Sequence, residues 1–152
     1  ASSRALAITG THLSNPKTRE AVLTALEYAG RNNVKRALDI DYRPVLWGLT
    51  NPGDGETRFI ASEEVTQNLQ DVLGHFDLIV GTEEEFHIAG GSEDTLTALK
   101  TVRKHTDAVL VCKRGALGCS VFEGELPDHI DGALNVLGVR VEVMNVMKPD
   151  VA

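Results

Sequence analysis

The sequence predicts an α/β fold: a three-layer, Rossmann-like sheet that is mostly parallel, carries helices on both faces and ends in an antiparallel hairpin at one edge. Two observations support this prediction. Short apolar runs alternate with segments of helical periodicity along most of the 152 residues, and this alternation is typical of parallel βαβ units. Near residue 115, two strand-like runs follow each other across a short glycine-containing turn, which is typical of a hairpin.

Length and composition favour a single α/β domain over residues 1–152. A hydrophobic content of 42% is enough for a sizeable core. The net charge of -7 and the lack of a Lys/Arg cluster disfavour nucleic acid and anionic membranes as partners. No run is long enough to span a membrane, and residues 1–7 do not resemble a signal peptide. We therefore expect a cytoplasmic protein with small-molecule partners, whose self-association as a homo-oligomer stays open.

The first part of the chain predicts two strands with a helix between them. Residues 4–9 are an apolar run that indicates a strand. Asn15 followed by Pro16 indicates a helix start, because Asn can accept bonds from free N–H groups and Pro fits the first turn. Apolar residues at helical spacing continue to about Arg31, and residues 34–40 form the next short strand.

The rest of the chain continues the same alternation. Residues 49–57 are rich in Gly, Pro, Asn and Asp and indicate an exposed loop. Ser62 then caps a helix that ends at Gly74. The remaining expected elements are a strand at 77–81, helices at 82–89 and 92–105, a strand at 108–113, its antiparallel partner at 119–123, and a further strand at 136–146.

Two cysteines, Cys112 and Cys119, flank the expected hairpin turn. They are too few for a disulfide framework, and neither has a Cys or His nearby at a zinc spacing. With the turn centred between Gly115 and Ala116, we expect the two cysteines to face each other across the hairpin and to remain reduced. The five histidines are scattered and predict neither a nucleophile nor a metal site.

The first candidate site follows the strand expected at 34–40. Asp41 and Arg43 come directly after it, and Pro44 cannot continue a strand. The carboxyl ends of strands in open α/β sheets are where ligands bind, and an arginine fork suits a carboxylate or phosphate. The alternative is a surface loop in which Arg43 pairs with Asp39 or Asp41.

The second candidate site is a run of three glutamates after Thr82. Thr82 and Glu85 fit a capping box at a helix start, and that structural role explains both residues. Carboxylates at the carboxyl end of a strand also suit a hydrated magnesium ion. Both interpretations stay open, because a capping glutamate can still offer its second oxygen.

The third candidate site is the turn of the expected hairpin. Lys113 and Arg114 precede Gly115 and Gly118, so backbone N–H groups and positive charge could meet a nucleotide phosphate there. The alternative is a glycine-rich hairpin turn whose two cations are solvated.

Three stretches, in this order, resemble one known family. They are Asp-Ile-Asp-Tyr-Arg-Pro-Val-Leu-Trp at 39–47, Gly-Thr-Glu-Glu-Glu-Phe at 81–86 and Val-Cys-Lys-Arg-Gly-Ala-Leu-Gly-Cys at 111–119. With these stretches the chain resembles the central part of a ribokinase-like (PfkB) carbohydrate kinase, from about residue 6 to residue 146. The resemblance implies a ribokinase-like fold that is truncated at both ends.

The resemblance also implies an activity, which is transfer of the ATP γ-phosphoryl group to a hydroxyl of a sugar acid with Mg²⁺ bridging the phosphates. The implied substrate is 5-dehydro-2-deoxygluconate of inositol catabolism, with 2-keto-3-deoxygluconate as the alternative. By position, Asp41 and Arg43 are the implied substrate contacts and Glu85 the implied metal contact. The implied nucleotide contacts are Lys113, Arg114, Gly115 and Gly118.

The chain departs from the family pattern after Val146. The family continues into Gly-Ala-Gly-Asp, which supplies an anion hole and the catalytic base, whereas this chain reads Met-Lys-Pro-Asp at 147–150. Pro149 has no N–H for an anion hole. We therefore assign no catalytic residue and expect the chain to lack both the N-terminal lid and substrate portion and the C-terminal nucleotide portion, and to be inactive alone. The alternative from another class is a non-catalytic α/β module that binds a nucleotide or a protein.

Overall fold

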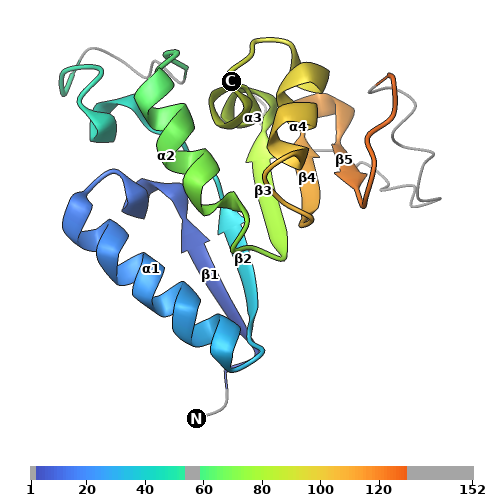
Figure 1. Ribbon diagram of the computed structural model, residues 1–152. Helices are drawn as coiled ribbons and strands as arrows, with labels where there is room; N and C mark the ends of the chain where they lie inside the picture. The colour runs from blue at the N-terminus through green and yellow to red at the C-terminus, as the bar shows by residue number, and fades with distance from the viewer. Residues whose placement is uncertain (1–2, 54–58, 130–152) are drawn as a thin grey trace, which may run out of the picture.

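Five strands form one mostly parallel sheet, in the order β1-β2-β3-β4-β5 (Figure 1). The computed structural model describes residues 3–53 and 59–129. Strands β1 to β4 are parallel to one another, and β5 is antiparallel to β4. The strand bounds are Ala5–Thr9, Lys35–Asp39, Leu78–Thr82, Val109–Lys113 and Cys119–Phe122. The predicted α/β sheet with an antiparallel edge is confirmed.

The described residues contain four α-helices, and every one starts at a capping side chain. Asn15, Ser62, Thr82 and Asp94 each accept a hydrogen bond from a backbone N–H group in the first turn. The helices are α1 (Pro16–Arg31), α2 (Glu63–Leu73), α3 (Glu83–Gly90) and α4 (Thr95–Arg103). Short 3-10 helices follow β1, β2 and β4, at Gly10–Leu13 (η1), Pro44–Trp47 (η2) and Gly115–Leu117 (η3).

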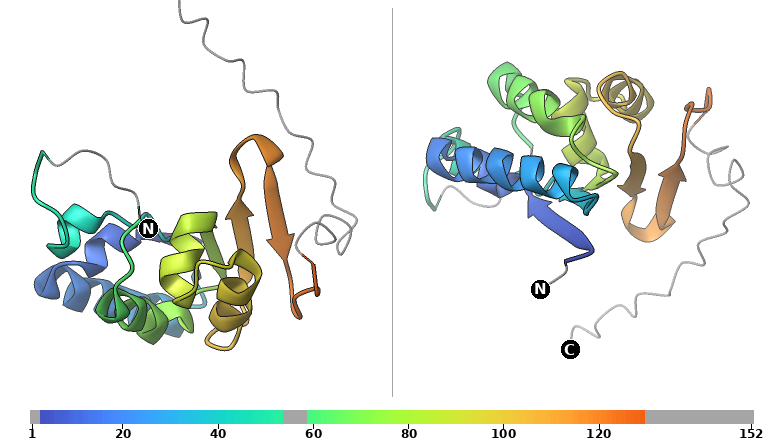
Figure 2. Two further views of the ribbon diagram at one scale, coloured as in Figure 1. Left: turned by 90° about the horizontal axis from the view of Figure 1, so that it is seen from above. Right: turned by 60° about the horizontal axis from the view of Figure 1, so that its bottom comes forward.

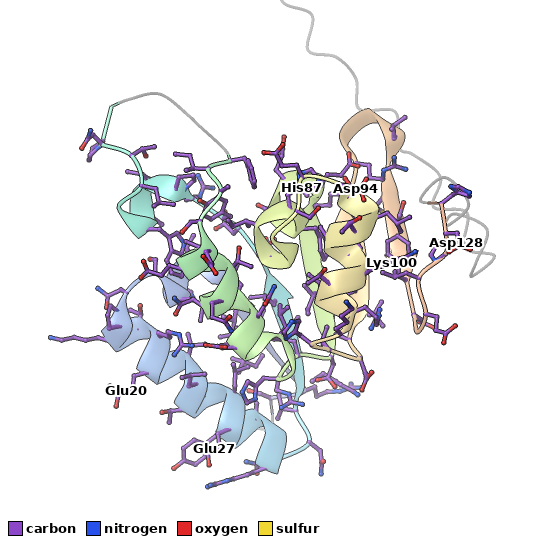
Figure 3. All side chains as sticks on the ribbon, turned by 45° about the horizontal axis from the view of Figure 1, so that its top comes forward. Glu20, Glu27, His87, Asp94, Lys100 and Asp128 are labelled. Carbon is purple, nitrogen blue, oxygen red and sulfur yellow. The ribbon has the colours of Figure 1, made fainter. Side chains whose placement is uncertain are left out.

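The four described helices lie on one face of the sheet (Figure 2). Consecutive strands are neighbours in the sheet, and right-handed crossovers that all advance in one direction place every connecting helix on the same side. Figure 3 shows Glu20 and Glu27 on the outer side of α1. The described residues therefore supply one of the two helical layers that the sequence predicts.

The core lies between the sheet and these helices. The sheet contributes Leu38, Ile79 and Leu110, which are fully buried, and the helices contribute residues such as Leu26 and Leu99. Along β3 and β4, buried side chains alternate with half-exposed ones, because successive residues of a strand point to opposite faces. The strand face away from the helices remains partly open among the described residues.

Two glycines allow close approaches between backbone segments, one at the end of β2 and one between α3 and α4. A Cβ at Gly10 would lie 2.0 Å from the carbonyl oxygen of Ile40, so the segment after β1 could not pass the end of β2 with any larger residue. A Cβ at Gly90 would lie 2.4 Å from the carbonyl oxygen of Ala98. The end of α3 can therefore pack directly against the backbone of α4.

The hairpin has a different register from the predicted one. Lys113 pairs with Cys119, and Cys112 pairs with Ser120. The connection of residues 114–118 has an odd number of residues and is closed by a bond from the Arg114 N–H to the Gly118 carbonyl at 2.7 Å. The prediction that Cys112 and Cys119 face each other is therefore wrong, although both are free thiols.

A further prediction, the strand at 136–146, lies outside the described residues. Within the part of the chain that is described, no helix has the length and apolar character needed to cross a membrane.

Candidate functional site

Charged side chains gather where β2, β3 and β4 end. These three strands are parallel neighbours, so their carboxyl ends lie at the same edge of the sheet. The residues at or just beyond the strand ends are Asp39, Asp41, Arg43, Glu83, Glu85, Lys113 and Arg114. All seven predicted site residues, which are Asp41, Arg43, Glu85, Lys113, Arg114, Gly115 and Gly118, follow one of these three strands or end it. This edge is where open α/β sheets bind ligands.

The end of β2 carries Asp41 and Arg43 on a sharply bent backbone. Asp41 has a positive φ of 36°, which is uncommon for a residue other than glycine and turns the chain away from the strand. The Arg43 Nε donates to Asp41 Oδ1 at 3.1 Å, while the Arg43 side chain remains 62% exposed. Of the two ion-pair partners considered for Arg43, the structure shows Asp41.

Tyr42, between these two residues, anchors the loop in the core. Its hydroxyl donates to the Ile60 carbonyl at 2.6 Å. Burial raises the pKa of this hydroxyl, and the bond to the Ile60 carbonyl opposes that shift. A buried, hydrogen-bonded Tyr42 fixes the loop, so the two neighbouring charged residues project from a defined position.

Asp39 is the partner of Lys113 instead. The Lys113 Nζ lies 3.5 Å from Asp39 Oδ1, across the intervening strand β3. Both side chains are about half exposed, so the pair adds little stability and its lysine can exchange partners readily. Lys113 is a cation at the upper edge of the sheet that a phosphate could recruit.

Thr82 and Glu85 form the predicted capping box at the start of α3. The Thr82 N–H donates to Glu85 Oε2 at 2.7 Å, and the Glu85 N–H donates to Thr82 Oγ1 at 3.2 Å. The described residues contain no group of three or more His, Cys, Asp or Glu side chains that could hold a metal ion. The capping box accounts for the positions of Thr82 and Glu85, and a metal contact at Glu85 stays a prediction.

The turn after β4 depends on its two glycines. Gly115 has φ 56°, and Gly118 has φ 86° and ψ -135°, a conformation that side chains disfavour strongly. Arg114, which starts the turn, is only 11% exposed, and its Nε lies 3.4 Å from Glu83 Oε1. The expectation of two solvated cations thus fits Lys113 but not Arg114, which is turned toward α3.

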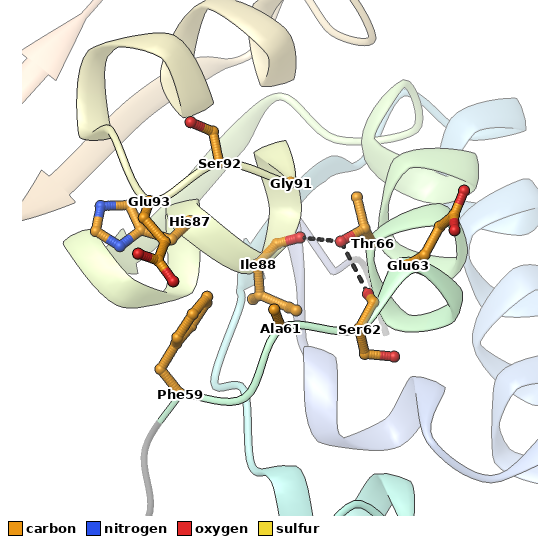
Figure 4. Close-up of a pocket in the computed structure, with 10 residues that line it drawn as sticks. All are labelled: Phe59, Ala61, Ser62, Glu63, Thr66, His87, Ile88, Gly91, Ser92 and Glu93. Carbon is orange, nitrogen blue, oxygen red and sulfur yellow. Dashed lines mark hydrogen bonds between the residues drawn. The ribbon is translucent and has the colours of Figure 1, made fainter.

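A pocket of about 400 Å³ lies between the start of α2 and the end of α3 (Figure 4). The rings of Phe59 and His87 meet edge to face with their centroids 6.1 Å apart. The Thr66 hydroxyl donates to the Ile88 carbonyl at 2.7 Å and ties the two helices together. The pocket is lined by Phe59, Ala61, Ser62, Glu63, Thr66, His87, Ile88, Gly91, Ser92 and Glu93.

Sequence reasoning missed this pocket and gave His87 no role. The pocket joins residues that are about 20 to 30 positions apart in the chain, and no local spacing marks such a meeting. The signal that was present is the run of small residues after Ile88, which lets α3 end close to α2 and α4.

Cys112 lies under the same edge of the sheet and is not a nucleophile. It is fully buried on the helical face of β4. Desolvation raises the pKa of its thiol to about 12, with the nearby Glu83 carboxylate adding to the rise. The thiol therefore stays protonated at neutral pH.

Comparison with known proteins gave sequence relatives and structural neighbours, while no family model matches the chain. The chain is 34% identical over 128 residues to a 5-dehydro-2-deoxygluconokinase of Photobacterium profundum, which covers 80% of this chain and 35% of that protein. It is also 34% identical over 136 residues to the protein of the same name from Bacillus anthracis, covering 86% of this chain and 37% of that protein. The chain thus spans about a third of the length of these relatives.

Solved structures of sugar kinases share the fold. A fructokinase of Vibrio cholerae, solved with fructose, ADP and calcium, has a TM-score of 0.65 at 18% identity over 81% of this chain and 37% of that one. A PfkB protein of Polaromonas has a TM-score of 0.61 at 19% identity, covering 78% of this chain and 36% of the other. At these identities the likeness establishes the fold alone.

Proposed function

We infer that the protein containing this chain transfers the γ-phosphoryl group of ATP to a hydroxyl of a sugar acid. The chain belongs by sequence and fold with the ribokinase-like (PfkB) carbohydrate kinases. The relatives of similar sequence are named 5-dehydro-2-deoxygluconokinase, and we propose 5-dehydro-2-deoxygluconate, in inositol catabolism, as the substrate. The cytoplasm is the proposed compartment, in keeping with two free thiols.

One observation carries this proposal: the cationic and acidic groups that phosphoryl transfer needs follow three adjacent parallel strands. Arg43 follows β2, Glu85 follows β3, and the glycine turn follows β4. Phosphoryl transfer depends on positioning and on stabilising charge, so donors for a substrate anion and for phosphates have to converge on one edge. The sequence relatives supply the sugar-acid class, which the geometry by itself does not.

Each predicted residue has a proposed role at this edge. Arg43 binds the substrate carboxylate and exchanges its contact with Asp41 for that ligand, because a guanidinium can hold a carboxylate with two parallel bonds. The Gly115–Gly118 turn offers backbone N–H groups to the nucleotide phosphates, with Lys113 as the mobile cation and Arg114 as part of the same site. Glu85 holds Mg²⁺ through water or directly, and the ion neutralises phosphate charge when bound.

A direct test uses the full-length protein and measures ADP release with ATP and Mg²⁺. We expect turnover with 5-dehydro-2-deoxygluconate and much slower turnover with fructose, a neutral sugar. Preference for 2-keto-3-deoxygluconate would replace the named substrate and keep the sugar-acid class. ATP binding without phosphorylation of any acid would overturn the kinase proposal in favour of a nucleotide-binding module.

A further inference from the structure

Four side chains form a continuous network of polar contacts from the pocket to the glycine turn. His87 Nε2 lies 2.8 Å from Thr95 Oγ1, Thr95 Oγ1 lies 3.3 Å from Glu83 Oε1, and Arg114 Nε lies 3.4 Å from the same oxygen. His87 and Glu83 are on α3, Thr95 is the first residue of α4, and Arg114 follows β4. This network links three elements over a short distance, and no sequence motif includes all four residues.

The chemistry of these groups fixes the direction of every bond. A carboxylate only accepts hydrogen bonds, so Arg114 and Thr95 both donate to Glu83 Oε1. A threonine hydroxyl has one proton, and here that proton points to Glu83. Thr95 Oγ1 must then accept from His87, which requires the proton of His87 to be on Nε2. The histidine therefore orients the hydroxyl, and the hydroxyl orients the carboxylate that holds Arg114.

The last contact of this network is made by Arg114, the residue that starts the glycine turn. Arg114 is held by Glu83 through its side chain and by Gly118 through its backbone N–H, at 2.7 Å. Its carbonyl also accepts from the Leu117 N–H at 3.1 Å. With an 11% exposed side chain, Arg114 is fixed on both sides, whereas the turn that it starts is exposed at Gly115 and Leu117.

We propose that Thr95 and Glu83 are positioning residues, which hold the Gly115–Gly118 turn through Arg114 in the conformation that receives the nucleotide phosphates. This inference rests on the proposed kinase function. The two cations of the turn then have different roles. Lys113 can move from Asp39 to a phosphate, while Arg114 anchors the backbone. The contacts of Thr95 and Glu83 lead to Arg114, so we expect their loss to change nucleotide binding alone.

The test compares Thr95→Val with Thr95→Ser in the full-length protein. Valine keeps the shape of threonine and removes the hydroxyl, whereas serine keeps the hydroxyl. We expect Thr95→Val to raise the KM for ATP by about two- to tenfold, the range of one neutral hydrogen bond, with kcat and the KM for the sugar acid nearly unchanged. Thr95→Ser should behave as wild type. Equal KM values for ATP in all three proteins would overturn the proposal.

A second pair of variants addresses Glu83. Glu83→Gln weakens the acceptor for Arg114 and should raise the KM for ATP more than Thr95→Val does, because it removes a charged contact. The control is Glu84→Gln, since Glu84 is exposed on the same turn of α3. A rise in the KM for ATP that is as large for Glu84→Gln as for Glu83→Gln would mean a general charge effect and contradict the proposal.

Calorimetric titration with ATP and Mg²⁺ separates this inference from the proposed function. If the wild-type protein binds ATP but phosphorylates no acid, the kinase proposal fails, and a weaker Kd for Thr95→Val than for Thr95→Ser still supports the positioning role. If both variants bind ATP as tightly as wild type, the positioning role fails even in an active kinase. Melting temperatures of the variants show whether a loss reflects unfolding instead, and a loss that follows unfolding counts against the proposal.

Discussion

Arg43 follows β2 and is our proposed contact for the substrate carboxylate, and its ion pair with Asp41 bears directly on that proposal. Asp41 Oδ1 accepts from the Arg43 Nε at 3.1 Å, and the Arg43 side chain is 62% exposed. An exposed ion pair is worth little, about 0 to 1 kcal/mol. A sugar carboxylate that offers two charge-assisted bonds can therefore compete with Asp41 for the guanidinium.

We predict that Arg43→Ala in the full-length protein lowers kcat/KM for the sugar acid by about tenfold to several hundredfold, since charge-assisted bonds contribute about 1.5–3 kcal/mol. Arg43→Lys should lose less because it keeps the charge but not the fork. The KM for ATP should hardly change. Steady-state kinetics on the acid and on its neutral amide measure the effect.

The matched control for that prediction is Arg31→Ala. Arg31 is 65% exposed and pairs with Glu27 on α1, so it resembles Arg43 in exposure and partner but lies at the other end of the sheet. We expect no change in kcat/KM for this variant. An equal loss for the acid and for its amide in Arg43→Ala would show that Arg43 only supports the structure of the loop.

The two cysteines should differ sharply in reactivity. With a pKa of about 12 and complete burial, Cys112 has almost no thiolate at pH 8, whereas Cys119 is partly exposed on the other face of the hairpin. Because the thiolate is the reacting species, iodoacetamide at pH 8 should modify Cys119 and leave Cys112 intact until the protein unfolds. Peptide mass spectrometry of native and denatured samples checks this. Equal native labelling would place Cys112 outside the core.

Among the elements, Asp77 ties the amino ends of β2 and β3 together. Its Oδ2 accepts from the Arg36 N–H at 2.8 Å, and its carboxylate lies near the side chains of Lys35 and Arg36. The Arg36 N–H bond is the main cause that lowers the pKa of Asp77, ahead of the two cations. The folded pKa is below the unfolded value of about 4. This stabilisation is therefore present above pH 4 and is lost as the pH falls through the folded pKa.

We predict that Asp77→Asn lowers the melting temperature at pH 7 by a few degrees, on the order expected for one partly exposed charged contact. At pH 3 the two proteins should differ less, because acid removes the same charge from the wild type. Asp71→Asn is the control, since Asp71 meets Arg19 only at 3.9 Å between two helices. A difference that grows toward pH 3 would contradict the assigned sign.

At the scale of elements, the sequence predicted what local chemistry determines. Asn15 and Ser62 mark helix starts because the capping bond spans only two or three residues. The hairpin register failed because it depends on the length of the connection between Arg114 and Gly118, which composition does not specify. The short 3-10 helix that follows β2 went unpredicted, since a proline there indicates only where the strand ends.

The same distinction applies to the candidate site. The three stretches at the ends of β2, β3 and β4 were recognisable because each is continuous in the chain. The contacts of Glu83 with Thr95 and with Arg114 join residues 12 and 31 positions apart. No periodicity predicts such contacts, because they arise only when α3, α4 and β4 have packed.

For the whole molecule, one face of the sheet defines what the described residues can do alone. Leu78, Val80, Val109 and Val111 are only half-buried, and they point away from the face that the described helices cover. Parallel sheets are normally covered on both faces. The chain spans about a third of its relatives' length. If the kinase site requires helices on both faces of the sheet and contacts on both sides of the nucleotide, the described elements alone do not supply it.

We predict that the 152-residue chain, mixed with ATP, Mg²⁺ and 5-dehydro-2-deoxygluconate, releases no ADP above background. Phosphoryl transfer requires a positioned acceptor, neutralised phosphates and an acceptor for the hydroxyl proton in one water-poor site. The described residues include Arg43 and the glycine turn, but the stretch after Val146 has a proline where the resemblance places an anion-binding N–H. Measured side by side, the full-length protein is the positive control. Turnover of the short chain at about 1–100 per second, the usual kinase range, would mean that these elements suffice for catalysis.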